Sequence, residues 1–198
     1  MEWLIGIDEA GRGALAGPVS VGVVLYPADL DWKEAFSLVA KKGKPVLRDS
    51  KQLTSQQRTI LFGYITSHAR LRHAHAFSDA KTIDEIGIVN ATNEAAARAI
   101  EQLGIRPSRV SVLLDAGLRV PAKWSQESFV RGDENIPAIA FASIIAKVSR
   151  DRYMEEAASV HTGYQFGEHK GYGTEAHRRY IRKAGLCELH RVTFCTRI

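Results

Sequence analysis

The stretch Ile5-Gly6-Ile7-Asp8-Glu9-Ala10-Gly11-Arg12-Gly13 joins a short apolar run to two adjacent acids and a glycine-arginine-glycine turn. The apolar run predicts a buried strand, and we expect Asp8 and Glu9 to follow where that strand runs out of ladder partners. Glycines on both sides of Arg12 allow the backbone to approach another molecule closely, and the arginine carries a fork of donors suited to phosphate. The stretch therefore indicates a metal site beside a nucleic-acid site, although an acidic turn after a strand would show the same pattern.

The composition indicates one soluble globular domain. With 198 residues, 45% hydrophobic and 25% charged, the chain can bury a substantial core and shows no sign of disorder. Its longest apolar stretches, residues 19–26 and 136–146, are too short to span a bilayer, and the first residues lack the pattern of a signal peptide. We expect a cytoplasmic monomer with no membrane partner.

Basic residues gather in two regions of a chain whose net charge is +5 and whose isoelectric point is near 9.3. The second region is the histidine-rich segment 161–197. The first region, residues 41–58, contains one acid, Asp49, and the cations Lys41, Lys42, Lys44, Arg48, Lys51 and Arg58. Both regions fit surfaces that face phosphate, and both also fit an ordinary solvated basic face.

The two cysteines, Cys187 and Cys195, form no paired metal-binding motif. A zinc site that adds His190 to them is conceivable, but it lacks a second pair of ligands. Two reduced thiols in a reducing compartment are the better interpretation.

Hydrophobic periodicity and turn residues predict an α/β fold. The expected strands cover residues 4–7, 19–25, 71–77, 110–114 and 128–130. The expected helices cover residues 31–40, 55–68, 79–103, 136–158 and 175–183, with Thr54 and Thr174 as N-caps. Three strands followed by alternating helices and strands imply a mixed sheet with helices on both faces.

Acids follow three of the expected strands: Asp8 with Glu9 after Ile7, Asp115 after Leu114, and Asp133 just beyond Val130. Carboxylates that converge at one sheet edge repel one another unless cations neutralise them, and hard oxygen ligands select Mg²⁺ or Mn²⁺. Two such ions can activate water and stabilise the departing oxygen in phosphodiester cleavage. We expect Asp8 and Asp115 to be the central ligands. Neighbouring strand residues face opposite sides, so Asp8 and Glu9 should meet only if the chain leaves regular geometry there.

Four motifs, in order along nearly the whole chain, resemble those of bacterial ribonuclease HII. They are Gly6-Ile7-Asp8-Glu9-Ala10-Gly11-Arg12-Gly13, Asp49-Ser50-Lys51, Gly132-Asp133 continuing to the segment 142–151, and His169-Lys170-Gly171-Tyr172-Gly173-Thr174. The resemblance implies an RNase H-like fold with a mixed five-stranded sheet in a single domain, residues 1–198. It also implies that residues from about 160 to 198 form a helical, basic, substrate-binding extension.

The resemblance further implies an endoribonuclease that hydrolyses the RNA strand of RNA/DNA hybrids and acts in RNA primer removal. It implies cutting on the 5′ side of a single ribonucleotide in duplex DNA, which leaves a 3′-hydroxyl and a 5′-phosphate. Asp8, Glu9, Asp115 and Asp133 match the catalytic, metal-binding set. Gly11-Arg12-Gly13 matches the motif that tests the 2′-hydroxyl, and Tyr172 matches the tyrosine that senses the RNA-to-DNA junction.

Other polar residues fit either the substrate or the surface. Ser50 and Lys51, in a loop, and Lys147, on a helix, are candidate contacts to the nucleic-acid backbone. Asp151 is better interpreted as an ion-pair partner of neighbouring bases, and His169 as either a phosphate contact in a loop or an exposed residue.

The chain departs from the family pattern at three positions. Ala14 stands where proline is usual, Ala116 separates Asp115 from Gly117, and Arg131 stands where lysine is frequent. The first predicts a less rigid turn, and the second puts the loop geometry beside a metal ligand in doubt.

Three rival interpretations remain. A type HIII ribonuclease shares the acids but usually carries an extra N-terminal domain, whereas this chain begins almost directly at the catalytic strand. A hybrid-binding protein of the same fold would lack activity, and retention of the four acids and Tyr172 argues against it. A metal-dependent phosphatase of small substrates would not need two broad basic segments. The sequence does not decide between Mg²⁺ and Mn²⁺.

Overall fold

A mixed five-stranded sheet forms the centre of the protein, as the sequence predicts. The computed structural model describes residues 2–40, 45–48 and 50–198. The strands are β1 (Trp3–Ala10), β2 (Val19–Pro27), β3 (Arg72–Ser78), β4 (Val110–Asp115) and β5 (Ser125–Phe129), in the spatial order β3-β2-β1-β4-β5. β2 is antiparallel to β1 and β3, whereas β4 is parallel to β1 and β5.

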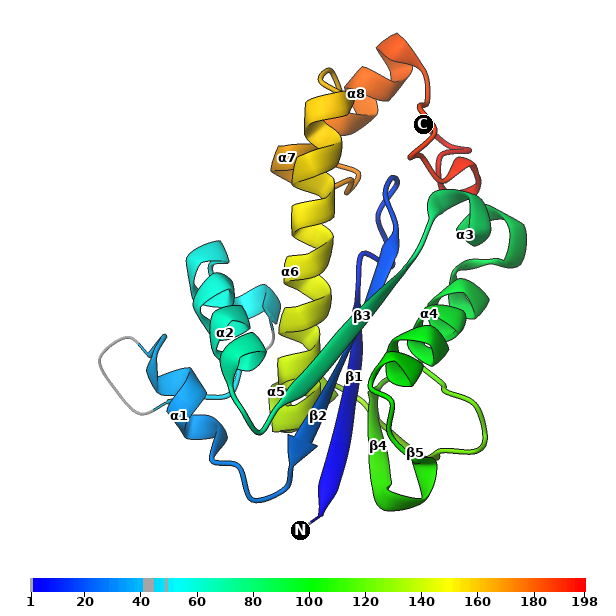
Figure 1. Ribbon diagram of the computed structural model, residues 1–198. Helices are drawn as coiled ribbons and strands as arrows, with labels where there is room; N and C mark the ends of the chain where they lie inside the picture. Colours follow the sequence, from blue (N-terminus) through cyan, green and yellow to red (C-terminus); the bar gives the residue numbers. More distant parts are fainter. Residues whose placement is uncertain (1, 41–44, 49) are drawn as a thin grey trace.

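Helices cover both faces of the sheet, which confirms the predicted layers. α4 (Ile88–Gln102) lies against one face and the long helix α6 (Pro137–Val160) against the other (Figure 1). All nine residues of β2 are buried because the strand has a helix on each side. Ile5, Ile7 and Val23 pack with the alanines of α4, and Val24 and Tyr26 pack with Phe141 of α6.

Two glycines allow α6 to lie directly on the central strands. A Cβ atom on Gly6 would lie 1.9 Å from the carbonyl oxygen of Ala138, and one on Gly22 would lie 2.4 Å from that of Ala142. Any larger residue would push the helix away from the sheet. Asp8 follows Gly6 on the same face of β1, so this close packing fixes where its carboxylate lies relative to α6.

The remaining helices surround these layers. They are α1 (Trp32–Ser37), α2 (Ser55–Ser67), α3 (Ala80–Ile86), α5 (Gly132–Asn135), α7 (Phe166–His169) and α8 (Glu175–Ala184). Single 3₁₀ turns span Ser50–Gln52, Pro107–Arg109 and Val192–Phe194. The predicted caps are confirmed: Thr54 forms a capping box with Gln57 at the start of α2, and Thr174 caps α8.

Three local predictions are wrong. Residues 79–103 form two helices, because Gly87 adopts φ +80° between α3 and α4. Residues 116–124 join β4 to β5 without the helix that alternation predicts. His169 ends α7 rather than lying in a loop. Asp133 lies just beyond β5, as expected, and belongs to the short helix α5.

The segment 161–198 packs on the turn that follows β1. Ala16 forms an isolated antiparallel bridge with His190, the N–H of Gly17 donates to the carbonyl oxygen of Leu189 at 2.8 Å, and the N–H of Arg191 donates to that of Leu15 at 2.8 Å. These contacts place the C-terminal end of the chain against the turn that contains Gly11, Arg12 and Gly13. Within the described residues, no helix is long and apolar enough to cross a membrane.

Candidate active site

Three of the predicted acids converge at one edge of the sheet. Asp8 and Glu9 lie in β1 and Asp115 ends β4, and one carboxylate oxygen from each lies within 4.8 Å of the others. The parallel pairing of β1 with β4 ends at Ile7, whereas its pairing with β2 continues to Ala10. The expectation that β1 runs out of partners at Asp8 is thus correct on the β4 side only.

The expectation that Asp8 and Glu9 meet only in irregular backbone is wrong. Both residues keep regular pairing, with Gly22 and Val21. Because β4 ends at Asp115, the flank of β1 is open there, and both side chains reach the same space. The backbone N–H of Glu9 donates to Oδ1 of Asp8 at 2.7 Å, which fixes the inner carboxylate.

Burial and mutual repulsion make this cluster electrostatically unfavourable when it is fully ionised. Burial raises the pKa of Asp8 well above its usual value, and the charges of Glu9, Asp115 and Asp133 raise it further. Burial also raises the pKa of Glu9, although Arg12 opposes the shift and donates to Oε1 at 3.4 Å. A cation would remove the repulsion.

The donor set fits a hard divalent cation. Oε2 of Glu9 is buried and has no hydrogen-bond partner among the described residues, and such an atom costs free energy unless a ligand satisfies it. Every neighbouring group in the cluster is a carboxylate, the ligand type that Mg²⁺ and Mn²⁺ prefer.

Asp133 stands at the side of the cluster. Its Oδ2 lies 3.7 Å from Nζ of Lys51, and its charge contributes to the raised pKa of Asp8. The N–H of Gly132 donates to Oδ1 of Asp115 at 2.9 Å, so the start of α5 is tied to the end of β4. The fourth acid is therefore near the three others, but it is not in the group that shares the 4.8 Å spacing.

A pocket of ≈ 610 Å³ opens over the acids and gathers most of the predicted site. Its lining contains Asp8, Glu9, Gly11, Arg12, Gly13, Ser50, Lys51, Asp115, Lys147 and Tyr172, together with Ala10 and Arg58. The sequence analysis placed Arg58 only in a general basic region, which was the available signal for it. Lys41, Lys42, Lys44 and Asp49 lie outside the described residues.

Two buried arginines shape the turn beside the acids, and the sequence analysis missed both. Arg150 donates to the carbonyl oxygens of Pro18, Lys170 and Ala16 at 2.9, 2.8 and 3.1 Å. Arg191 donates to the carbonyl oxygens of Gly17, at 3.0 and 2.9 Å, and of Arg12, at 2.9 Å. Both side chains are 0% exposed, and burial lowers the pKa of Arg191 to about 9.

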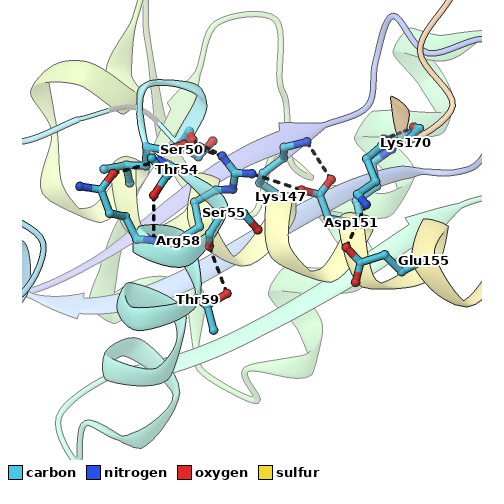
Figure 2. A network of polar contacts seen from close by, with 12 residues as sticks. Ser50, Thr54, Ser55, Arg58, Thr59, Lys147, Asp151, Glu155 and Lys170 are labelled. Atoms are coloured by element: carbon cyan, nitrogen blue, oxygen red, sulfur yellow. Dashed lines mark hydrogen bonds and ion pairs between the residues drawn. The ribbon is translucent and has the colours of Figure 1, made fainter. Parts of the chain in front are cut away.

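Two cations that line the pocket, Arg58 on α2 and Lys147 on α6, pair with the same acid (Figure 2). Asp151 accepts a hydrogen bond from Lys147 at 2.7 Å and lies 3.6 Å from Nη2 of Arg58, which confirms its predicted role as an ion-pair partner. Arg58 also donates to the carbonyl oxygens of Ser50 and Leu53, at 3.1 and 2.7 Å. One acid thus aligns two cations along the rim.

Tyr172 lines the same pocket as the acids. Its side chain is exposed, with the guanidinium of Arg150 5.3 Å and Nζ of Lys147 5.9 Å from the ring centroid. The carbonyl oxygen of Gly171 accepts hydrogen bonds from the N–H groups of Leu15, at 2.9 Å, and Ala16, at 3.2 Å. The tyrosine backbone is therefore attached to the same turn that carries Gly11 to Gly13.

The conceivable zinc site fails because its ligands are dispersed. Cys195 is buried with its Sγ directed to the carbonyl oxygen of Leu15 at 3.8 Å, whereas Sγ of Cys187 lies 3.2 Å from Nδ1 of His190. Both thiols are free.

The departures from the family pattern do not disturb the acids. The N–H of Ala14 donates to the carbonyl oxygen of Gly11 at 3.3 Å, a bond that proline could not make. Ala116 is exposed, and Asp115 still reaches Asp8 and Glu9.

Comparisons with known proteins agree with this geometry. The protein family described as Ribonuclease HII matches residues 5–197. A ribonuclease HII of Caldicellulosiruptor bescii is 42% identical over 197 residues, which are 99% of this chain and 88% of that protein.

Solved structures show the same fold. The ribonuclease HII of Archaeoglobus fulgidus, solved in complex with PCNA, has a TM-score of 0.68 and 25% identity, covering 94% of this chain and 92% of that one. Bst-RNase HIII in complex with Mn²⁺ has a TM-score of 0.66 over 98% of this chain and 65% of that one, and its 17% identity supports the fold alone. The match across nearly all residues shows that the chain belongs to the ribonuclease HII family and is an enzyme of the ribonuclease H type.

Proposed function

We propose that this enzyme hydrolyses the RNA strand of RNA/DNA hybrids and cuts on the 5′ side of single ribonucleotides in duplex DNA. The observation that carries the proposal is the single pocket that brings three buried or half-buried acids, a glycine-arginine-glycine turn and Tyr172 together. A small-molecule phosphatase would need the acids but not the exposed aromatic ring in the same pocket.

Asp8, Glu9 and Asp115 would hold divalent cations, with Asp133 as a fourth ligand. Bound in this way, the ions would supply the activated water and the stabilisation of the leaving oxygen that phosphodiester hydrolysis requires. The protein contributes rigidity: Asp8 is fixed by the N–H of Glu9, and Asp115 by the N–H of Gly132. Mg²⁺ and Mn²⁺ both fit these ligands.

The turn from Gly11 to Gly13 would recognise the ribonucleotide. Its backbone is held from behind by Arg191, which donates to the carbonyl oxygen of Arg12, so it presents a fixed edge to the pocket. A 2′-hydroxyl both donates and accepts hydrogen bonds, and a rigid backbone edge can therefore distinguish RNA from DNA there.

Tyr172 would contact the deoxyribose on the far side of the junction. A flat ring packs against a sugar that lacks a 2′-hydroxyl, and the extra oxygen of RNA would meet this apolar face. Together, the turn and Tyr172 would favour a ribonucleotide followed by a deoxyribonucleotide, the arrangement at a single ribonucleotide in DNA, over the continuous RNA strand of a long hybrid. Cleavage of such substrates would serve in ribonucleotide removal from DNA and in RNA primer removal.

Lys51, Lys147 and Arg58, with Ser50, would contact the phosphates that flank the cut. Their arrangement along one rim of the pocket suits a phosphate backbone, and such contacts make binding sensitive to salt but not to sequence. We propose a cytoplasmic monomer.

The test is cleavage of a labelled RNA/DNA hybrid by the wild type and Asp115→Asn, each with Mg²⁺, with Mn²⁺ and with chelator. We expect metal-dependent cleavage by the wild type and almost none by Asp115→Asn. Asp29→Asn is the matched control, because Asp29 is exposed and pairs with Arg70. If the wild type binds the hybrid but does not cleave it, the proposed activity is wrong and the protein is a non-catalytic hybrid-binding protein.

A further inference from the structure

Three histidines of the C-terminal segment lie in contact directly behind Tyr172. His177 and His190 are 1% and 3% exposed, and the ring of His169 stacks on that of His177 with 4.2 Å between centroids. None of the three lines the pocket over the acids. Two buried ionisable rings, with a half-buried third stacked on one of them, need an explanation, because each could instead be an apolar residue.

The hydrogen bonds fix the proton on His177 and His190. Nδ1 of His177 lies 2.9 Å from the carbonyl oxygen of Tyr172, which can only accept, so this nitrogen carries the proton. Nδ1 of His190 accepts from the N–H of Cys187 at 2.9 Å and lies 3.2 Å from the carbonyl oxygen of the same residue, so the shorter contact assigns the proton of His190 to Nε2. The Nε2 atoms of the two rings are 3.1 Å apart, and His190 donates to His177.

The result is a directed chain of hydrogen bonds from Cys187 through His190 and His177 to Tyr172. Both ring nitrogens of His169 also have hydrogen-bond partners. Its Nδ1 accepts from the N–H of Gly171 at 3.1 Å, and its Nε2 lies 2.7 Å from the carbonyl oxygen of Tyr164. A second proton on any of the three rings would face an N–H that already donates to it. Each ring is therefore held in one neutral tautomer.

These hydrogen bonds complete a closed set of contacts that links the two proposed recognition elements, Tyr172 and the Gly11–Gly13 turn. His190 forms the β-bridge with Ala16, and the N–H of Ala16 donates to the carbonyl oxygen of Gly171 at 3.2 Å. His177 holds the next carbonyl, that of Tyr172. The position of Tyr172 relative to the turn after β1 is thus set on one side by Ala16 and on the other by the histidine pair.

We propose that His190 and His177 are positioning residues that set the distance between Tyr172 and the Gly11–Gly13 turn, and through it the selectivity for a single ribonucleotide. This inference rests on the proposed function. A junction requires the two recognition elements to be one nucleotide step apart, whereas a long hybrid offers ribonucleotides at every step. Loss of the histidine pair should therefore weaken cleavage at a single ribonucleotide more than cleavage of a long hybrid.

The kinetic test compares kcat/KM on the two substrates. His177→Phe keeps a ring beside Phe166 and His169 but removes both hydrogen bonds, and we expect it to lower the ratio of single-ribonucleotide to hybrid cleavage by about tenfold. His190→Gln retains an amide donor towards His177, and we expect a ratio within about twofold of the wild type.

His161→Phe is the matched control. His161 belongs to the same segment, and its ring centroid lies 6.0 Å from that of Phe166. It pairs with Glu188 rather than with His177 or His190. We expect the control to leave the ratio unchanged. Thermal unfolding of each variant shows whether it is folded.

A second measurement uses the wild type alone. Long-range proton–nitrogen spectra of its imidazole rings should show the Nδ1–H tautomer for His177 and the Nε2–H tautomer for His190 at neutral pH. An Nε2–H tautomer at His177 would overturn the inference even if His177→Phe does not fold.

The outcomes separate the inference from the proposed function. A lowered ratio in His177→Phe with a retained ratio in His190→Gln supports the inference. Wild-type cleavage at the single ribonucleotide with an unchanged ratio in His177→Phe overturns the inference alone. A wild type that does not cut at a single ribonucleotide overturns the proposed function and the inference with it.

Discussion

A Cβ atom on Gly11 would lie 1.9 Å from Nε of Arg150. Gly11 also adopts φ +88°, a conformation that side-chain-bearing residues avoid. The buried arginine therefore packs against the backbone of the recognition turn at a point where only glycine fits.

Replacing Gly11 with alanine should destabilise the protein. Backbone strain and the clash with Arg150 together predict a loss of about 3 kcal/mol in the free energy of unfolding. Gly13→Ala is the matched control, because its Cβ would have no other atom within 4 Å. Denaturant titration of both variants measures the difference, and equal losses would show that Arg150 does not hold the turn.

Replacing Asp8 with asparagine should separate stability from activity. Asp8 is 3% exposed and surrounded by acids, so in chelator the neutral amide should raise the free energy of unfolding, by about 1 kcal/mol. Turnover should fall more than about a hundredfold because a ligand is lost. Urea unfolding and hybrid cleavage check the two effects. A variant that is less stable in chelator would contradict the repulsion described for the cluster.

Replacing Tyr172 with alanine should reduce selectivity for the junction. Loss of the ring should lower cleavage at a single ribonucleotide about tenfold more than cleavage of a long hybrid, the size of one stacking contact. Tyr172→Phe retains the ring and should behave as the wild type. Equal losses on both substrates in Tyr172→Ala would remove the junction role of this residue.

Replacing Lys51 with alanine should weaken binding and its dependence on salt. The Lys51 side chain is 74% exposed at the pocket, and loss of one phosphate contact should reduce the slope of log K against log salt by about 1. Lys81→Ala is the control, since the Lys81 side chain is 85% exposed and pairs with Glu85 on α3. An unchanged slope in Lys51→Ala would assign Lys51 to the solvated surface.

The histidine pair should make stability depend on pH. Burial lowers the pKa of His177 from 6.5 to about 4, so between these values the unfolded chain binds a proton that the folded chain does not. The stabilisation is complete above the unfolded pKa and is lost as pH falls towards the folded pKa, by up to about 3 kcal/mol. Urea unfolding across this range should show a shallower decline in His177→Asn. Parallel profiles would contradict the neutral state of His177.

The sequence predicts the central fold because each strand and helix start is marked by residues close together in the sequence. β2 is a run of apolar residues, and the caps at Thr54 and Thr174 mark where helices begin. The break at Gly87 was missed because apolar residues at helical spacing stand on both sides of it, Ile83 and Ile86 before and Ala91 and Ala95 after. The connection from β4 to β5 was missed because parallel neighbours are usually joined through a helix.

Some residues of the candidate site can likewise be predicted from the sequence, and others cannot. The acids, Lys51 and Tyr172 stand in motifs with characteristic neighbours, and the structure places them in one region. Arg150, Arg191 and the histidine pair have no local signature. Their partners lie far away in sequence: Arg150 bonds Pro18 across 132 positions and Arg191 bonds Gly17 across 174. Only the folded chain reveals such contacts.

The most direct test of the account is to map the cut in a labelled DNA duplex that contains one ribonucleotide. The account predicts a cut on the 5′ side of the ribonucleotide that leaves a 3′-hydroxyl and a 5′-phosphate, requires Mg²⁺ or Mn²⁺, and disappears with chelator. A cut on the 3′ side, or cleavage that persists in chelator, would contradict it.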